Sequence, residues 1–368
     1  MSASHLGLVV LLLAPAVGSA RVIHVSPSGG AEAPGTAEKP LRSLERALAQ
    51  AAEGDTIRLA AGNHAPATSA LPLQLARAAV TLEGGWDAAF AHRDPWATPS
   101  WILAPADVDR PLLEVAAGAR RVVVDGVGFD GGPGLRYGGR GLSESGLGRL
   151  FPLVRVERAE DVVFRQCVFL NGAAHALRAS VRTAFTLDGS LLVNHRVSAF
   201  TAWGTEQGAR VVITGNTFLG VWAEKPGGAR GDAVDLQRHV EARLERNVFD
   251  DVQGTCLRVQ RGNDAMRVKD NAFGRCALGA ARTWPGAGPP VDHALAALER
   301  ADLTEVSGNR ALPASAIVDT GAYSAAALLR HPPDGGRPAT PAWAPRFTSP
   351  VLPLLGLDAR AGARVTAP

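Results

Sequence analysis

Short stretches of alternating apolar and polar residues recur along the chain, and each breaks at a turn before a final apolar residue. One copy is VVITGNTF, which ends at Phe218. The other copies end at Phe129, Phe169, Leu192, Phe249, Phe273 and, in a weak copy, Ala311. The shortest steps between these positions are about 23 residues. A repeat of this length predicts the coil of a parallel β-solenoid. Leucine-rich repeats are similar in length, but their leucine spacing and helical half are missing.

The position two residues before the final apolar residue is an asparagine in three successive copies. These are Asn216, Asn247 and Asn271, while Ser190 and Cys167 occupy the same position in two earlier copies. Stacked amides hydrogen-bond to one another from strand to strand, so the column predicts an amide ladder. Asparagine also tolerates the left-handed backbone of a tight corner. Cys167 is therefore predicted to be a turn residue and not a nucleophile.

A second set of strands aligns without gaps, at residues 153–157, 176–180, 199–203, 233–237 and 256–260. Their second and fourth residues are apolar, which places the first, third and fifth on the other side of the strand. The third residues form an outward row of Arg155, Arg178, Thr201, Asp235 and Arg258. The fifth residues form a second row of Glu157, Ser180, Trp203, Gln237 and Gln260. Two strands with a shared period indicate two stacked parallel sheets.

The two ends of the chain lack this period. Apolar residues at helical spacing (Leu41, Leu44, Ala47, Leu48 and Ala51) predict a short amphipathic helix that caps the open end of the solenoid. Residues 1–20 have the apolar run and small terminal residues of a signal peptide, which predicts a secreted or periplasmic protein. The expected domain is 21–330, followed by an irregular Pro/Gly-rich tail at 331–368. No later segment suits a membrane helix.

Charge and cysteine content narrow the function classes. The net charge is +3 and no basic run occurs, which argues against nucleic-acid binding but suits an acidic ligand. Three cysteines do not make a disulfide scaffold, so buried free thiols are expected, with a single bridge as the alternative. A monomer is expected.

The opening segment, HVSPSGG at 24–30 followed by KPLRSLERALAQAAEGDTIRLAAG at 39–62, precedes coils of the form VxIxxNxF. Together with VTLEGGWDAAFAHRDPW at 80–96, this pattern resembles secreted right-handed parallel β-helix proteins of the pectate-lyase-like superfamily. The resemblance covers about residues 22–312. It implies an all-β, right-handed parallel β-helix whose ligands lie along the outward face of one sheet. The superfamily includes lyases, hydrolases, epimerases, adhesins and non-catalytic proteins. None of its polygalacturonase, pectate lyase, alginate lyase or epimerase motifs is present, so no site residue can be transferred.

The outward rows therefore supply the site hypothesis. A stripe of Arg, Asp, Trp and Gln suits a charged sugar chain, because Arg pairs with carboxylates, Trp stacks on rings and amides bind hydroxyls. Insertions at 131–149 and 222–231 enter the same face and would wall a groove. The predicted substrate-binding residues are Arg155, Arg178, Trp203, Gln237, Gln260, Tyr137 and Trp222. The predicted partner is an acidic polysaccharide.

Polysaccharide lyase activity on a uronate polymer is the reaction that these residues suggest. Such an enzyme neutralises the uronate carboxylate with Arg or Ca²⁺ and then removes the adjacent proton with a base. The predicted catalytic residues are Lys225, Arg258 and Asp235, with Tyr137 or His239 as other bases. No metal ligands are assigned, and Ca²⁺ is the one cofactor considered.

Two alternatives remain at this point. A hydrolase needs a pair of carboxylates, and Asp232 with Asp235 is the nearest approach. Residues three apart in a strand point to opposite faces, so this pair works only if Asp232 lies in the turn before the strand. A non-catalytic structural or surface-binding protein is the other alternative. The remaining histidines His24, His175, His195 and His293 are expected to be structural or solvated.

Overall fold

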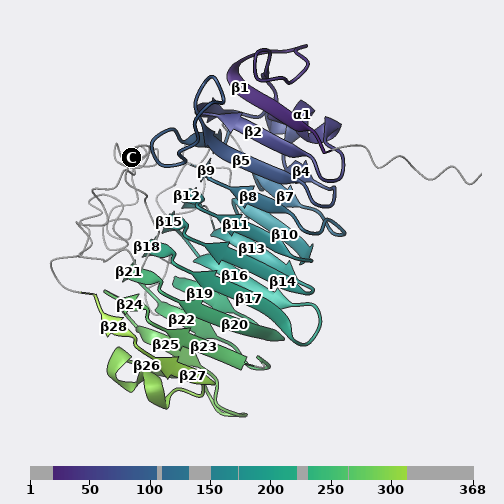
Figure 1. Ribbon diagram of the computed structural model, residues 1–368. Helices are drawn as coiled ribbons and strands as arrows, with labels where there is room; N and C mark the ends of the chain where they lie inside the picture. The colour runs from purple at the N-terminus through teal and green to yellow at the C-terminus, as the bar shows by residue number, and fades with distance from the viewer. Residues whose placement is uncertain are drawn as a thin grey trace, which may run out of the picture.

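The computed structural model describes residues 20–105, 110–131, 151–172, 174–221, 231–263 and 265–312. The predicted signal peptide, the C-terminal tail and most of both insertions lie outside these ranges. Figure 1 shows the described chain as a stack of coils running from the purple N-terminal end to the green C-terminal end. Within the described residues, no helix has the length and hydropathy needed to cross a membrane.

Each complete coil contributes one strand to each of three sheets, here called sheets A, B and C, and the strands of successive coils pair in parallel. Sheet A contains β1 (Val22–Gly30), β2 (Thr56–Ala60), β5 (Thr81–Trp86), β8 (Val123–Asp125), β11 (Val162–Arg165), β14 (Ala184–Asp188), β17 (Ala209–Thr214), β20 (Val240–Glu245), β23 (Ala265–Lys269) and β27 (Glu305–Ser307). Sheet B contains β3 (Gly62–His64), β6 (Ser100–Leu103), β9 (Val127–Asp130), β12 (Val168–Gly172), β15 (Leu191–His195), β18 (Thr217–Val221), β21 (Val248–Val252), β24 (Ala272–Phe273) and β28 (Arg310–Ala311). Sheet C contains β4 (Leu73–Leu75), β7 (Leu113–Val115), β10 (Val154–Ala159), β13 (His175–Val181), β16 (Ser198–Gly204), β19 (Asp232–Leu236), β22 (Thr255–Val259), β25 (Gly279–Thr283) and β26 (Val291–His293).

The predicted right-handed parallel β-helix is confirmed. The predicted period is also observed, since Val154 pairs with Leu177 and Leu177 with Phe200. The number of strands per coil was underestimated. The stretch around Phe218 contains two strands, β17 and β18, separated by a bend at Gly215 and Asn216. From the sequence, a bend of two residues was interpreted as a turn within one strand, although in the structure it takes the chain from one sheet to the next.

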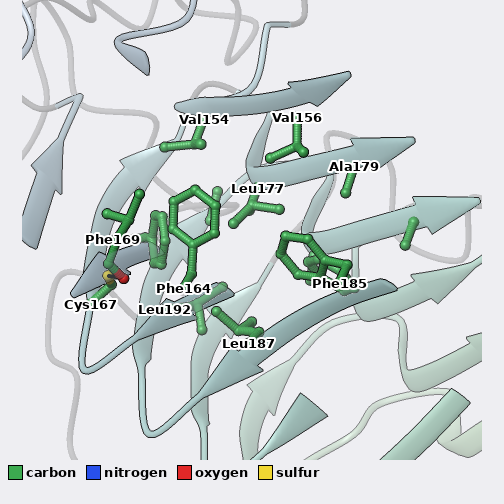
Figure 2. Close-up of a cluster of buried hydrophobic side chains, with 14 of the residues drawn as sticks. Val154, Val156, Phe164, Cys167, Phe169, Leu177, Ala179, Phe185, Leu187 and Leu192 are labelled. Atoms are coloured by element: carbon green, nitrogen blue, oxygen red, sulfur yellow. Dashed lines mark hydrogen bonds between the residues drawn. The ribbon is translucent and has the colours of Figure 1, made fainter. Parts of the chain in front are cut away.

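Stacked side chains fill the space between the three sheets. The rings of Phe218 and Phe249 stack with centroids 4.9 Å apart, and Phe249 continues the stack to Phe273 at 5.2 Å. Figure 2 shows the middle of the core, where Phe164 and Phe185 come from sheet A and Phe169 comes from sheet B. All of these rings are buried. Each coil therefore buries its apolar residues against the next coil, as expected for a solenoid.

The predicted amide ladder is present at the bend between sheets A and B. Asn216 donates to the Oδ1 of Asn247 at 3.1 Å, Asn247 to that of Asn271 at 3.0 Å, and Asn271 to that of Asn309 at 3.0 Å. Each Oδ1 also accepts the backbone N–H of the preceding member of the ladder. The left-handed backbone is not at the asparagines, as the sequence suggested. It lies one residue earlier, for example at Arg246 with φ of 54°.

The cysteine prediction is correct for Cys167 and wrong for the other two. Cys167 is buried at the bend, and burial raises the pKa of its thiol to about 12, so it is not a nucleophile. Cys256 and Cys276 form a disulfide with a Cα–Cα distance of 5.7 Å. Cys256 is in β22, and Cys276 forms a bridge with Val252 of the preceding strand β21. The coil spacing thus brings the two cysteines together, although no pattern in the sequence marks them as a pair.

The N-terminal cap is the predicted helix, although it is shorter than the apolar spacing suggested. It is α1 (Leu44–Gln50), and it packs against β1 and β4. The Ser43 side chain caps it by accepting from the backbone N–H of Arg46 at 3.0 Å. Two further 3-10 helices are η1 (Thr68–Ala70) and η3 (Leu295–Arg300). At the other end of sheet C, β26 pairs antiparallel with β25, a hairpin that the sequence did not predict.

Candidate functional site

The outward row of sheet C is continuous through the observed register. Arg155 pairs with Arg178, Arg178 with Thr201, Thr201 with Asp235, and Asp235 with Arg258. The row continues through Glu114 at one end and Arg282 at the other. Adjacent members are therefore one strand spacing apart, about 4.8 Å. The predicted row is thus a physical line of side chains along the solenoid axis.

Two adjoining hollows lie over this row and are here called the sheet C groove. The first has a volume of about 500 Å³ and is lined by His175, Arg178, Val197, Ser198, Thr201, Asp232, Asp235, Gln237, Arg258 and Gln260. The second has a volume of about 550 Å³ and is lined by Trp203, Gln237, Arg238, Gln260, Arg261 and Trp284. Because Gln237 and Gln260 line both hollows, the two form one site.

Asp235 lies at the centre of the groove and is only 8% exposed. Its Oδ1 accepts from the Gln260 amide at 2.9 Å, and its Oδ2 accepts from the Gln237 amide at 3.3 Å. Burial raises the pKa of the Asp235 carboxyl above 3.8, although nearby Arg258 and the two amides oppose this effect. The environment therefore favours a carboxyl that can exchange a proton nearer to neutral pH.

Arg258 lies between two carboxylates. One of its nitrogens is 3.6 Å from the Oδ2 of Asp232, and its Nε is 3.8 Å from the Oδ1 of Asp235. The Oδ1 of Asp232 accepts from the backbone N–H and the hydroxyl of Thr255, at 2.8 and 2.7 Å. The side chain of Arg258 is 17% exposed, so its charge is largely committed to these partners.

The condition set for the hydrolase alternative, that Asp232 lie in the turn before the strand, is not met as stated. Asp232 is the first residue of β19, and it directly follows the corner at Gly231, whose φ is 94°. This corner lets Asp232 and Asp235 line the same hollow although they are three residues apart. Two buried carboxyl groups therefore belong to the candidate site.

Each end of the groove carries an arginine placed over a tryptophan. The guanidinium carbon of Arg178 is 4.7 Å from the ring centroid of Trp203, and that of Arg258 is 5.4 Å from the ring centroid of Trp284. Arg178 is exposed, and no carboxylate of the described residues lies within ion-pair distance of it. The sequence analysis did not include Trp284, because β25 (Gly279–Thr283), which directly precedes it, was not recognised as a copy of the repeat.

His175 also lines the groove, although the sequence suggested only a structural or solvated role. Its Nδ1 is 2.6 Å from the Oγ of Ser198 and 3.2 Å from the Oγ1 of Thr201. The two hydroxyls are 2.7 Å apart. Ser198 pairs with Asp232 in the register, so His175, Ser198 and Asp232 form one column. Extending the aligned repeat by one residue toward the N-terminus would have revealed this column.

Arg155, predicted to bind substrate, has carboxylate partners of its own. It pairs with Glu114, to which its Nε donates at 2.6 Å, and lies 3.5 Å from Glu157. It is not among the described residues that line the groove. His239, one of the two other bases considered, follows β19 and is likewise not a lining residue of the described groove.

Three predicted site residues, Tyr137, Trp222 and Lys225, lie outside the described residues. The predicted walls of the groove at 131–149 and 222–231 fall almost entirely outside them as well. The remaining histidines make local contacts. His195 is buried, with its Nδ1 accepting from the Gly172 N–H at 3.1 Å, and His293 is 2.9 Å from the Thr283 hydroxyl. Burial lowers the pKa of His24, whose ring packs edge-on against Phe90.

The groove residues do not fit a Ca²⁺ ion. Calcium needs several oxygen ligands that are free to face it. Three of the four carboxylate oxygens of Asp232 and Asp235 already accept hydrogen bonds, and Arg258 lies against both groups. Within the described residues, no group of three or more His, Cys, Asp or Glu side chains is arranged to hold a metal. The Ca²⁺ prediction stays a prediction, and no chemical step below depends on it.

Comparison with family models gives no match, and comparison with curated protein sequences gives none. Among solved structures, the chain is similar to a pectate lyase (TM-score 0.43, 12% identity, covering 94% of this chain and 89% of the other). It is also similar to an alginate lyase in complex with a trisaccharide (TM-score 0.40, 10% identity, covering 68% of this chain and 54% of the other). A third similar structure is a rhamnogalacturonan lyase (TM-score 0.36, 10% identity, covering 78% of this chain and 87% of the other). The chain thus spans about half the length of that alginate lyase. At this identity and TM-score these similarities support no functional argument, and the assignment as a parallel β-helix rests on the three sheets.

Proposed function

We propose that this protein is exported and binds an acidic polysaccharide along the sheet C groove. The observation that carries the proposal is Arg178. It is an exposed cation with no carboxylate partner among the described residues, and it lies over Trp203 at the edge of a polar hollow. An unneutralised guanidinium favours a ligand carboxylate or sulfate, which it binds through two parallel hydrogen bonds.

The rest of the groove suits the remainder of a sugar chain. The tryptophans offer faces on which the C–H groups of a pyranose ring can pack. Gln237, Gln260, Ser198 and Thr201 offer hydrogen-bonding groups for ring hydroxyls. The groove runs across strands, along the solenoid axis, and its two hollows are long enough together for several units of a polymer.

We further propose β-elimination on a uronate polymer as the reaction, favoured by the position of Asp235 beside Arg258. A base removes the proton from the carbon next to the uronate carboxylate. A double bond then forms to the neighbouring carbon, whose bond to the glycosidic oxygen breaks, and that oxygen takes up a proton. Asp235 is assigned proton transfer and Arg258 stabilisation of the developing negative charge, with Lys225 as the candidate base.

A direct test is the ultraviolet absorbance of the unsaturated uronate product on pectate, alginate, hyaluronan, chondroitin sulfate and heparin. We expect absorbance to rise on one class of polymer, and Asp235→Asn to lower the rate by at least about a hundredfold. No rise on any polymer, combined with measurable binding by calorimetry, would leave a binding protein without lyase activity. A rise in reducing ends without absorbance would instead favour hydrolysis by Asp232 and Asp235.

Affinity tests the binding proposal separately. Arg178→Gln should weaken binding of the preferred polymer by roughly tenfold or more, because a charge-assisted hydrogen bond is lost. The matched control is Arg58→Gln, since Arg58 also lies over a tryptophan, Trp86, at 4.1 Å, but in sheet A, away from the groove. Equal losses in both variants would contradict the assignment of the site to sheet C.

A further inference from the structure

Sheet B is apolar on its outward face as well as on its inward face in the middle of the solenoid. The inward side chains of β12, β15 and β18 belong to the core, and the residues between them point outward. One outward row follows the register through Val168, Leu191, Thr217 and Val248. The other outward row contains Leu170, Val193 and Leu219. The outward rows of sheets A and C, in contrast, are rich in charged residues.

The outward side chains of sheet B are buried. Leu170 and Val193 are 1% exposed, and Leu191 is completely buried. With Trp96 and Trp101 they form a hydrophobic cluster separate from the core between the sheets. Among the described elements, those that pack extensively against β12, β15 and β18 are neighbouring strands of sheets B and C, which belong to the same solenoid wall. A parallel sheet that is apolar on both faces is covered on both faces, so this wall needs a cover.

The chain leaves the solenoid on this sheet. Its last strand, β28, lies at one end of sheet B, and β24, β21, β18, β15 and β12 follow it along one side of the stack (Figure 1). Five strand spacings, about 24 Å, separate β28 from β12. About eight extended residues cover that distance, and the chain continues from 313 to 368. The insertions at 131–149 and 222–231 also leave from sheet B, but each returns to sheet C at the next strand, β10 or β19.

The C-terminal segment carries an apolar run that suits this face. Residues 351–357 read VLPLLGL, which contains no charged and no hydrogen-bonding side chain. The insertions differ from this run, because 131–149 is rich in Gly and contains Arg and Glu, while 222–231 contains Glu224, Lys225 and Arg230. Composition therefore favours the C-terminal segment over both insertions as the cover.

We infer that the outward face of sheet B is a docking surface for the C-terminal segment 313–368 of the same chain, and that the apolar run 351–357 supplies the main contact. Docking removes the outward rows from water, which stabilises the middle coils. An uncovered apolar face of this kind would promote association between molecules. The proposed polysaccharide site is on sheet C, so this inference does not depend on the proposed function.

Photo-cross-linking in the full-length protein tests the location of the segment. Val193 is replaced by a diazirine-bearing amino acid, and Val212, an outward residue of sheet A, receives the same replacement as the matched control. Mass spectrometry should find cross-links from position 193 to residues 313–368 of the same chain, and none to them from position 212. Cross-links from position 193 to 131–149, to 222–231 or to a second copy would overturn the inference. Absence of any cross-link to 313–368 would overturn it as well.

Substitutions in the run test its contact with the face. Leu352→Asp combined with Leu355→Asp leaves every residue of the coils unchanged, since both positions follow β28 in the sequence. This variant should melt about 2 °C or more below the natural protein and should bind more of a dye that fluoresces on exposed apolar surface.

The matched control for this variant is Ala359→Asp combined with Ala361→Asp. It adds the same two charges to the same segment, outside the run, and should change neither the melting temperature nor the dye fluorescence. Equal changes in the two variants, or no change in the Leu352/Leu355 variant, would overturn the contact assigned to the run.

Discussion

Asn247 shows how much one side chain contributes in this fold. Its amide donates to the Ile213 carbonyl at 2.8 Å and to Asn271, while its Oδ1 accepts from both the backbone and the side chain of Asn216. The residue is completely buried, so water cannot replace these partners. Each unpaired buried polar group costs about 1–3 kcal/mol. The ladder thus fixes the bend between sheets A and B by hydrogen bonding.

Asn247→Ala should lower the free energy of unfolding by about 3 kcal/mol or more, because two donors of Asn216 and one carbonyl lose their partners. Urea denaturation measures the loss. Asn309→Ala is the matched control, since Asn309 is the last member of the ladder and is partly exposed. The decrease in the free energy of unfolding should be clearly smaller for Asn309→Ala than for Asn247→Ala. Equal decreases in the two variants would contradict the role assigned to burial.

The raised pKa of Asp235 predicts a pH dependence of stability. A carboxyl whose pKa is higher in the folded state than in the unfolded state favours folding at pH below 3.8, and this contribution is lost as the pH rises through the folded pKa. Asp235→Asn does not titrate. The unfolding free energy of this variant, relative to the natural protein, should therefore increase from below pH 3.8 toward neutral pH. A decrease over that range would show that Arg258 lowers the pKa instead.

The sequence predicted which residues lie together on the outward face of sheet C, but it did not predict which side chains these residues pair with. The period of two assigns Arg178, Asp235 and Arg258 to one face, as observed. Whether an arginine is free or paired depends on neighbours from other coils, so the pairing of Arg155 with Glu114 was not foreseen. The place of Asp232 required the backbone conformation of Gly231, which spacing alone does not give.

At the scale of elements, the sequence marks positions where the chain repeats and misses those where it departs from the repeat. The weak copy near Ala311 forms β27 and β28, joined by the bend that carries Asn309. The hairpin of β25 and β26 and the helix η3 (Leu295–Arg300) have no copy among the other residues that the structure describes, and both were missed. In each coil, the consecutive strands of sheets A and B were interpreted as one strand, because the bend between them is only two residues long.

The disulfide of Cys256 and Cys276 joins two neighbouring coils, and its removal should weaken this part of the solenoid. The cysteines are 20 residues apart, and closing a loop of this size stabilises a protein by about 3 kcal/mol. Cys256→Ala should lower the free energy of unfolding by about this amount in urea denaturation. A reductant should lower it similarly in the natural protein and have no effect on the variant. Unchanged stability under both conditions would contradict the prediction.

For the whole molecule, stacking in register turns a periodic sequence into a long, straight site. Every coil adds one residue to each outward row, so a row of five residues becomes a line about 19 Å long. The sequence therefore predicts the orientation of the groove and most residues on its floor. Its walls could not be placed in the same way, because the insertions at 131–149 and 222–231 follow no period. That is where Tyr137, Trp222 and Lys225 were predicted to act.

The central claim is that an acidic polysaccharide binds along the sheet C groove. The most direct measurement is a crystal structure of the protein with a tetrasaccharide of the acidic polymer that it binds most tightly, at saturating concentration. The account predicts the oligosaccharide across β13, β16, β19 and β22, with one carboxylate at Arg178 and rings beside Trp203 and Trp284. A ligand bound on sheet A or sheet B, or a sheet C groove without sugar at that concentration, would contradict the claim.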